Sequence, residues 1–308
     1  MKYVSISDLN DYIIRNLHKF PHDIDLVVGI PRSGMLPANL LALYLNKPYT
    51  DIDSFIEGRI IGTGYRGRFI DKGPVHKVLV IDDSIGSGRA MRLAQEKLVP
   101  IKDNYELKYA AIIASPEGKA YVDYYCVVIA FPRVFQWNLF HHPIYVPNSC
   151  FDIDGVLCED PPIDDDGPIY LNYIKNAIPK YIPTVEINTL VTCRLEKYRE
   201  ATEEWLRKNH VKYKHLIMLD MASREDRLAW GKHGEYKGKV FANSPTEFFV
   251  ESSFSQAKII VKISKKTVFC TENFQMLTYQ KEVGSLAYFL FRVKRKLRTW
   301  RKSLKKNN

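Results

Sequence analysis

Short apolar runs alternate with segments of helical spacing along the first half of the chain, and this alternation limits the possible folds. Residues 25–30 (DLVVGI) and 77–81 (KVLVI) have the length and composition of buried strands, and each precedes a segment whose apolar residues recur every three or four positions. Strands that alternate with helices form parallel βαβ units. The sequence therefore predicts an open α/β sheet, with strands at residues 25–30, 77–81, 107–114 and 124–130 and helices at residues 34–45 and 87–98.

The same pattern restarts after an aromatic, proline-containing segment at residues 131–149. We therefore expect a second α/β unit and place the boundary near residues 140–149. In this unit the sequence predicts strands at residues 186–191, 215–219, 248–251 and 259–263 and a helix at residues 196–210. The predicted domains are residues 1–146, residues 147–283 and a C-terminal tail, residues 284–308.

The formal net charge of +10 comes largely from the tail, because nine Lys and Arg residues and no acid lie in residues 292–308. Residues 1–291 are close to neutral, so their charge disfavours a body that binds nucleic acid. From residue 286 onward, apolar residues form one stripe of a basic amphipathic helix. We expect this helix to bind a membrane surface. Packing on its own domain and an RNA-binding arm are the alternatives.

Composition and local motifs exclude several other classes of protein. Hydrophobic residues make up 46% of the chain and charged residues 26%, which excludes a disordered chain. The sequence shows no secretory signal and no apolar run long enough to span a membrane, and its five cysteines form no CxxC pair. We therefore expect a cytoplasmic protein that the tail can attach to the inner face of the membrane.

Two acids and a loop of small residues follow the strand at residues 77–81. Asp82 and Asp83 can accept hydrogen bonds from sugar hydroxyls, and backbone N–H groups at the start of the next helix form an anion site. A phosphorylated ribose could bind both groups, with its hydroxyls on the acid pair and its phosphate on the anion site. Taken alone, the acid pair also fits a helix N-cap followed by a solvated turn. The candidate loop comprises Ser84, Ile85, Gly86, Ser87 and Gly88.

The segment around these residues resembles the type I phosphoribosyltransferases over residues 20–130. The resemblance implies that phosphoribosyl pyrophosphate (PRPP) is a substrate, that Asp82 and Asp83 bind the ribose hydroxyls, and that residues 84–88 bind the 5-phosphate. It also implies that Arg32, Ser33 and Gly34 face the leaving pyrophosphate, with Mg²⁺ as a clamp. Residues 58–72 fall where that family has a mobile catalytic loop, with Arg66 or Arg68 supplying charge.

The second unit begins with two carboxylates, Asp152 and Asp154, after an apolar run. One carboxylate can attack phosphorus, and the other can protonate the leaving oxygen and then activate water. Both suit Mg²⁺, which prefers oxygen ligands. A lone DxD is otherwise commonly a turn or a cap.

The motif DxDGVL resembles motif one of the haloacid dehalogenase (HAD) superfamily, and the likeness extends over residues 148–275. It implies that Thr192 binds phosphoryl oxygens and that Lys237, with Lys232 and Lys239 as rivals, steadies the phosphate. It also implies a Mg²⁺ site formed by Asp152, Asp154 and Glu251. Many members carry two acids at the last position, whereas here Glu251 is followed by two serines.

The two resemblances together imply an enzyme that installs ribofuranose. Phosphoribosyl would pass from PRPP to an acceptor, and the phosphatase would then remove the 5-phosphate. With a membrane-facing tail, a lipid-linked glycan in polysaccharide assembly is the leading acceptor. The alternatives are a nucleobase phosphoribosyltransferase joined to a nucleotidase, a non-enzymatic RNA-binding regulator, and two halves that act on unrelated substrates.

Overall fold

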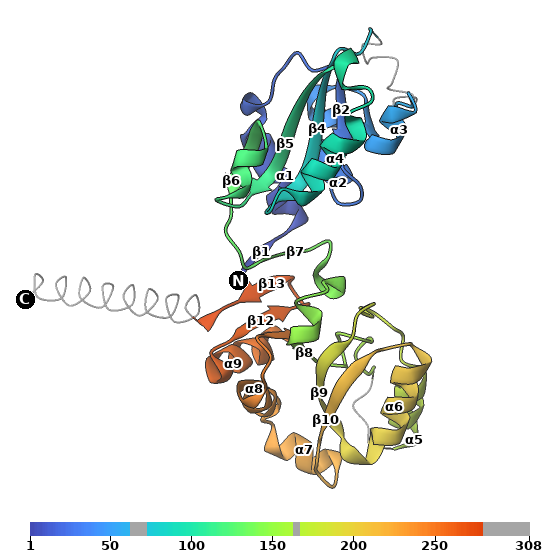
Figure 1. Cartoon of the computed structure of the whole chain (residues 1–308). Coiled ribbons are helices and arrows are strands. Elements are labelled where there is room, and N and C mark those ends of the chain that lie inside the picture. Colours follow the sequence, from blue (N-terminus) through green and yellow to red (C-terminus); the bar gives the residue numbers. More distant parts are fainter. Residues whose placement is uncertain (62–72, 163–166, 280–308) are drawn as a thin grey trace, which may run out of the picture. The chain divides into compact units, whose positions relative to one another are not determined.

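The structure is a computed structural model that describes residues 1–61, 73–162 and 167–279. The chain divides into two compact units, Met1–Trp137 and Asn138–Asn308, which are taken in turn (Figure 1). Part of the predicted mobile loop and the predicted basic tail lie outside the described residues. In the part that is described, no helix has the length and apolar character needed to cross a bilayer.

The first unit is built on a five-stranded, fully parallel sheet, which confirms the predicted α/β class. Its strand order is β3-β2-β4-β5-β6. A separate parallel pair joins β1, Lys2–Val4, to β7, Arg133–Phe135. The main strands are β2 (Leu26–Gly29), β3 (Tyr49–Asp51), β4 (Lys77–Ile85), β5 (Glu106–Ala114) and β6 (Tyr124–Val128).

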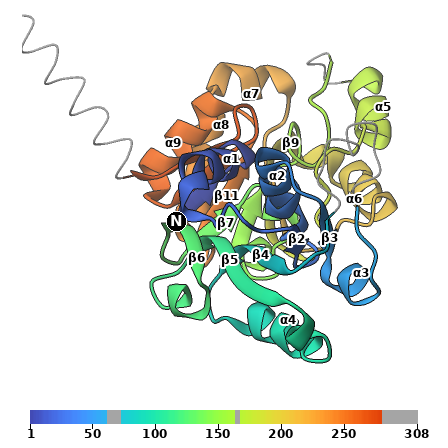
Figure 2. The same cartoon turned by 90° about the horizontal axis from the view of Figure 1, so that it is seen from above.

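Two layers of helices cover this sheet because both faces of its strands are apolar. Val27 of β2 points into a core shared with α1 (Ile6–Arg15) and α2 (Met35–Leu45). Its neighbours Leu26 and Val28 point to the opposite face, where α3 (Ile52–Ile56) and α4 (Arg89–Leu98) pack. This alternation with a period of two residues produces the two layers (Figure 2).

The second unit contains a six-stranded sheet in the order β10-β9-β8-β11-β12-β13, in which only the edge strand β13 is antiparallel. Helices α5 (Pro168–Asn176) and α6 (Arg199–Lys208) share a core on one face. Helices α8 (His233–Asn243) and α9 (Phe254–Ser264) cover the other face, and α7 spans Arg224–Trp230. The strands are β8 (Ser149–Phe151), β9 (Ile187–Leu195), β10 (Tyr213–Leu219), β11 (Phe248–Glu251), β12 (Thr267–Cys270) and β13 (Gln275–Leu277).

Helices α8 and α9 pack closely because glycines face α9. A Cβ on Gly234 would lie 3.1 Å from Cβ of Ile259, and a Cβ on Gly238 would lie 3.1 Å from Cβ of Ile263. The predicted strand at residues 259–263 is therefore wrong, since these residues lie inside α9. The buried residues of α9 recur at helical spacing: Ala257, Ile260, Val261 and Ser264.

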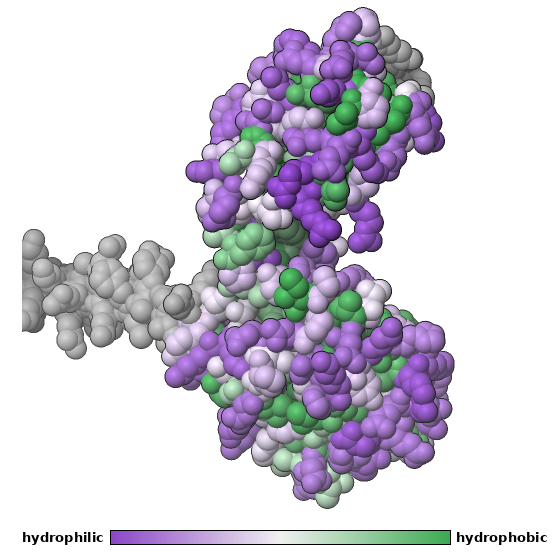
Figure 3. Space-filling view, viewed as in Figure 1, coloured by the Kyte–Doolittle hydropathy of each residue, from purple (hydrophilic) through white to green (hydrophobic). Residues whose placement is uncertain are grey.

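Polar residues cover most of the visible surface of each unit, and exposed apolar residues occur in small groups (Figure 3). This distribution is typical of folded domains, whose surfaces always retain some apolar area.

Candidate functional sites

The first candidate site lies where the strand order of the first sheet reverses, between β2 and β4. Ligands of open α/β sheets bind at the carboxyl ends of strands at such a point. The structure brings the loop after β2 against Asp82, near the carboxyl end of β4. A Cβ on Gly34 would lie 2.9 Å from Oδ1 of Asp82 and 2.4 Å from the carbonyl oxygen of Ile30, so only glycine fits there. The neighbouring Arg32 side chain is exposed.

Asp82 and Asp83 are both buried, at 7% and 4% exposure. Oδ1 of Asp82 accepts the backbone N–H of Asp83 at 2.8 Å. Burial, together with the charge of Asp83, raises the pKa of Asp82 to about 8. Two adjacent carboxylates out of water repel each other, so the pair favours a ligand that offers hydroxyl donors or a cation.

The candidate phosphate loop is shorter than predicted. Ser84 and Ile85 lie inside β4, paired with Ile113 and Ala114 of β5, so only residues 86–88 of the predicted loop 84–88 lie outside the strand. Gly88 has a φ of +73°, and it immediately precedes the first residue of α4. The loop therefore leads directly into the N-terminus of α4, and helix N-termini are suited to binding anions.

The segment Phe131–Trp137 also reaches this site, although no particular residue of it was predicted. The Phe131 ring lies against Gly86, where an added Cβ would be 3.0 Å from the ring. Arg133 is buried and donates a hydrogen bond to the carbonyl oxygen of Ile85 at 3.1 Å. Trp137 donates its indole N–H to Oδ2 of Asp83 at 2.8 Å. The aromatic composition of the segment is the signal that the sequence offers.

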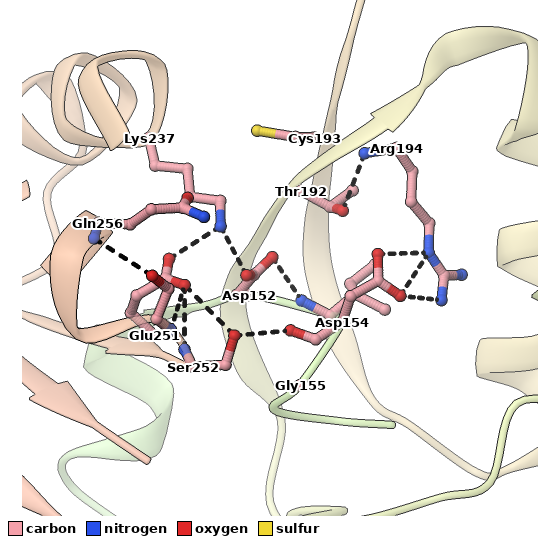
Figure 4. Close-up of polar contacts among 12 residues, drawn as sticks. Asp152, Asp154, Gly155, Thr192, Cys193, Arg194, Lys237, Glu251, Ser252 and Gln256 are labelled. Carbon is pink, nitrogen blue, oxygen red and sulfur yellow. Dashed lines mark hydrogen bonds and ion pairs between the residues drawn. The ribbon is translucent and has the colours of Figure 1, made fainter. Parts of the chain in front are cut away.

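The second candidate site also lies at a reversal of strand order, here between β8 and β11. Asp152 follows β8 directly, and Glu251 ends β11. Between them lies Lys237 of α8, whose Nζ donates to Oδ2 of Asp152 at 2.6 Å and to Oε2 of Glu251 at 2.8 Å (Figure 4). Its rivals Lys232 and Lys239 are both exposed, so Lys237 is the lysine that reaches the site.

The buried cluster of Asp152, Lys237 and Glu251 carries unbalanced charge, because two carboxylates share one ammonium group. Burial lowers the pKa of Lys237, but the two carboxylates outweigh that effect and raise it. Burial raises the pKa of Asp152 above its ordinary value, and Lys237 opposes the shift. The backbone after Glu251 also binds its carboxylate, because the N–H groups of Ser252 and Ser253 each donate to Oε1 at 3.0 Å.

Asp154 has a different partner, Arg194 of β9, which the sequence did not single out. The Arg194 side chain is fully buried, and its Nη2 lies 2.6 Å from Oδ1 of Asp154, while Nε lies 3.1 Å from both carboxylate oxygens. The Tyr173 hydroxyl also donates to Oδ1, at 2.9 Å. Burial raises the pKa of Asp154, but Arg194 outweighs it, so the pKa lies below its usual value. Asp154 therefore stays ionised and must leave Arg194 before it can act as a proton donor.

The three predicted metal ligands are not brought together. Within the ranges that the structure covers, no three acidic, His or Cys side chains are grouped closely enough to hold a metal ion. The cause is Arg194, which turns the Asp154 carboxylate away from Asp152 and Glu251. These last two carboxylates lie around one ammonium and carry excess negative charge, so they fit a hard divalent cation.

The Asp152 and Asp154 side chains open onto a cavity of about 540 Å³. Thr192 lines it beside Asp152 and is fully buried, with its hydroxyl accepting the backbone N–H of Arg194 at 3.1 Å. The lining is largely polar and includes Asp160, Tyr170, Lys180, Arg227, His233 and Glu272. Such a cavity suits a charged or strongly hydrated substrate.

Replacing Arg194 with methionine is expected to lower the free energy of unfolding of the second unit by about 2–4 kcal/mol, because the partly buried Asp154 would keep its charge without a cation. Chemical denaturation measures the effect. The matched control is Arg199→Met, since Arg199 pairs with Glu196 and Glu203 at the surface and should cost about 1 kcal/mol or less. Equal losses in the two variants would contradict the assigned role of the buried pair.

Comparisons with known proteins bear on the first site. Residues 5–148 match the family model described as the phosphoribosyl transferase domain. A curated relative, the xanthine-guanine phosphoribosyltransferase of Gluconobacter oxydans (strain 621H), is 29% identical over 129 residues, which are 39% of this chain and 71% of the relative. Residues 5–148 are thus similar to phosphoribosyltransferase domains.

Two solved structures are also similar to the chain. One is the xanthine-guanine-hypoxanthine phosphoribosyltransferase of Helicobacter pylori, at 14% identity and a TM-score of 0.33, over 45% of this chain and 92% of that one. The other is the purine phosphoribosyltransferase of Pyrococcus horikoshii Ot3, at 21% identity and a TM-score of 0.32, over 44% and 93%. The family model ends at residue 148, so the second site is interpreted from its motifs and geometry.

Proposed function

We propose that the first unit transfers a phosphoribosyl group from PRPP to an acceptor. The observation that carries this proposal is the buried pair Asp82 and Asp83, set against Gly34 at the reversal of strand order in a domain similar to phosphoribosyltransferase domains. The acid pair would bind the ribose hydroxyls, and the N-terminus of α4 would bind the 5-phosphate. Arg32, Ser33 and Gly34 would lie on the pyrophosphate side. Such a reaction needs mainly positioning and stabilisation of the leaving group.

We propose that the second unit hydrolyses a phosphomonoester. Asp152 would attack phosphorus to give an aspartyl-phosphate, while Thr192 and Lys237 bind the phosphoryl oxygens. Asp154, once released from Arg194 and protonated, would give its proton to the leaving oxygen and would then accept one from the water that cleaves this intermediate. Mg²⁺ would be held by Asp152 and Glu251 and would neutralise their excess charge. The support is the buried cluster of Asp152, Lys237 and Glu251 beside a polar cavity.

The two activities fit one sequence of reactions, in which the first unit attaches a 5-phosphoribosyl group and the second removes its phosphate. The product is then a ribofuranosyl conjugate without phosphate. The curated relative is named for xanthine and guanine, and this favours a nucleobase as the acceptor, with a nucleoside as the final product.

A glycan, lipid-linked and used in polysaccharide assembly, is the second candidate acceptor. It is favoured by the second site, since a phosphatase beside a nucleotide-forming enzyme would destroy the nucleotide. Binding to a membrane surface through residues 286–308 would belong to this candidate, although those residues lie outside the described part of the chain.

A panel of acceptors distinguishes the candidates. The full chain would be incubated with PRPP and Mg²⁺ together with free purines or with glycan acceptors, and the products followed by mass spectrometry. Addition of ribose to a purine supports the nucleobase, and addition to a glycan supports the second candidate. Chelation of Mg²⁺ should abolish both steps. If PRPP remains unconsumed with every acceptor while the chain binds RNA in a salt-sensitive way, the enzymatic proposal is wrong and a regulator is favoured.

A further inference from the structure

Asp83 needs a permanent partner in the first unit. Its carboxylate is 4% exposed and adjoins the carboxylate of Asp82, so it has lost most of its contact with water. A buried carboxylate is retained when hydrogen-bond donors compensate for the lost water. The indole N–H of Trp137 provides one, at 2.8 Å from Oδ2.

Trp137 is a fixed donor because its surroundings hold it in place. Its ring stacks on Phe135, with centroids 4.7 Å apart and planes within 5°. Phe135 is paired with Val4 of β1, and the next residue, Gln136, donates its backbone N–H to the carbonyl oxygen of Val4 at 2.9 Å. The backbone at Phe135 and Gln136, just before Trp137, is thus tied to the N-terminal strand, and the stacked Phe135 ring limits the movement of the indole.

The same segment is also tied to the end of β4. Arg133 donates hydrogen bonds to the carbonyl oxygens of Ile85 at 3.1 Å and Ile129 at 2.7 Å, and its guanidinium lies over the Phe131 ring at 4.5 Å. Ile85 directly precedes the candidate phosphate loop. One rigid segment therefore contacts both the acid pair and the strand end that leads into the loop.

We propose that Trp137 is a positioning residue of the first site: its indole N–H holds Oδ2 of Asp83, which leaves Oδ1 directed to a ribose hydroxyl of PRPP. This inference rests on the proposed function of the first unit. A carboxylate offers two oxygens with several acceptor positions. Occupying one oxygen with a fixed donor sets the orientation of the other, so the indole controls how tightly the diol is bound.

The test measures PRPP binding by the full chain in the presence of Mg²⁺, by calorimetry and by tryptophan fluorescence. In the wild type, PRPP should change the emission of Trp137. Trp137→Phe should abolish this change and raise the Kd for PRPP by about 10-fold to 100-fold, as expected for losing a hydrogen bond to a charged group. The KM for PRPP should rise by a similar factor, while kcat should change by only about 2-fold to 3-fold. The control, Trp230→Phe in α7, should keep both the emission change and the affinity.

A second variant separates the hydrogen bond from ring packing. Trp137 would be replaced by 3-benzothienylalanine, which keeps the shape and stacking of the indole but has no N–H donor. The same loss of affinity as in Trp137→Phe supports the proposal. Wild-type affinity in this variant, or in Trp137→Phe, overturns it. If the wild type itself does not bind PRPP, the proposed function of the first unit fails, and that result is distinct from a variant with unchanged affinity.

Discussion

Replacing Asp152 with asparagine is expected to abolish phosphomonoester hydrolysis while PRPP consumption continues. An amide cannot attack phosphorus as a carboxylate does, so hydrolysis should fall by about 10³-fold or more. The Asp152 side chain is buried and bonded to Lys237, and asparagine fills nearly the same space. Mass spectrometry of the reaction should therefore show the acceptor with a 5-phosphoribosyl group that is no longer converted to the ribosyl product.

The matched control for this variant is Asp160→Asn, which changes another carboxylate of the same cavity that the proposed reaction does not use. It should still yield the dephosphorylated product. Release of phosphate by Asp152→Asn at the wild-type rate would remove Asp152 as the nucleophile. A loss of PRPP consumption in Asp152→Asn would show instead that the two activities are not separable in this way.

The double replacement Asp82→Asn with Asp83→Asn is expected to give the opposite result. Without the two carboxylates the ribose hydroxyls lose their acceptors, and transfer from PRPP should fall by about 10²-fold to 10⁴-fold. Hydrolysis of a separately prepared 5-phosphoribosyl product should stay at the wild-type rate. Both rates can be measured on one preparation, by pyrophosphate release and by phosphate release.

Stability provides a check on the same double variant. Because burial beside Asp83 raises the pKa of Asp82, removing both charges relieves a repulsion, and the first unit should not be destabilised. Loss of transfer together with unfolding of the unit would therefore point to a structural role. Full transfer activity in a folded double variant would contradict the placement of the diol site.

Local patterns account for much of what the sequence predicted. The strands of the first sheet are apolar on both faces, and their spacing from the helices indicated the parallel order of elements. Lys237 could also be distinguished from its rivals, because Gly234, Lys237, Gly238 and Phe241 recur at helical spacing and share the buried face of α8. Lys232 and Lys239 fall off that face.

Contacts between distant positions were not predictable from such patterns. The pairs Arg194–Asp154 and Trp137–Asp83 are separated by 40 and 54 positions, and no local period relates their members. The length of β4 was underestimated for a related reason. Aspartate has a low strand propensity, but pairing of Asp82 and Ser84 with Ala111 and Ile113 extends the strand beyond the acids.

The close packing of α8 on α9 has a consequence for the phosphoryl chemistry proposed for the second unit. Gly234 and Gly238 lie one position or one turn from Lys237 on the same helix, and their missing side chains set how near the two helices approach. A charge-assisted hydrogen bond of 2.6 Å tolerates little displacement of its donor. The position of Lys237, and with it the hydrogen bond to Asp152, therefore depends on the contact between α8 and α9. Substitutions in that contact, remote from the cavity, are expected to alter the rate of the proposed hydrolysis without changing a polar group.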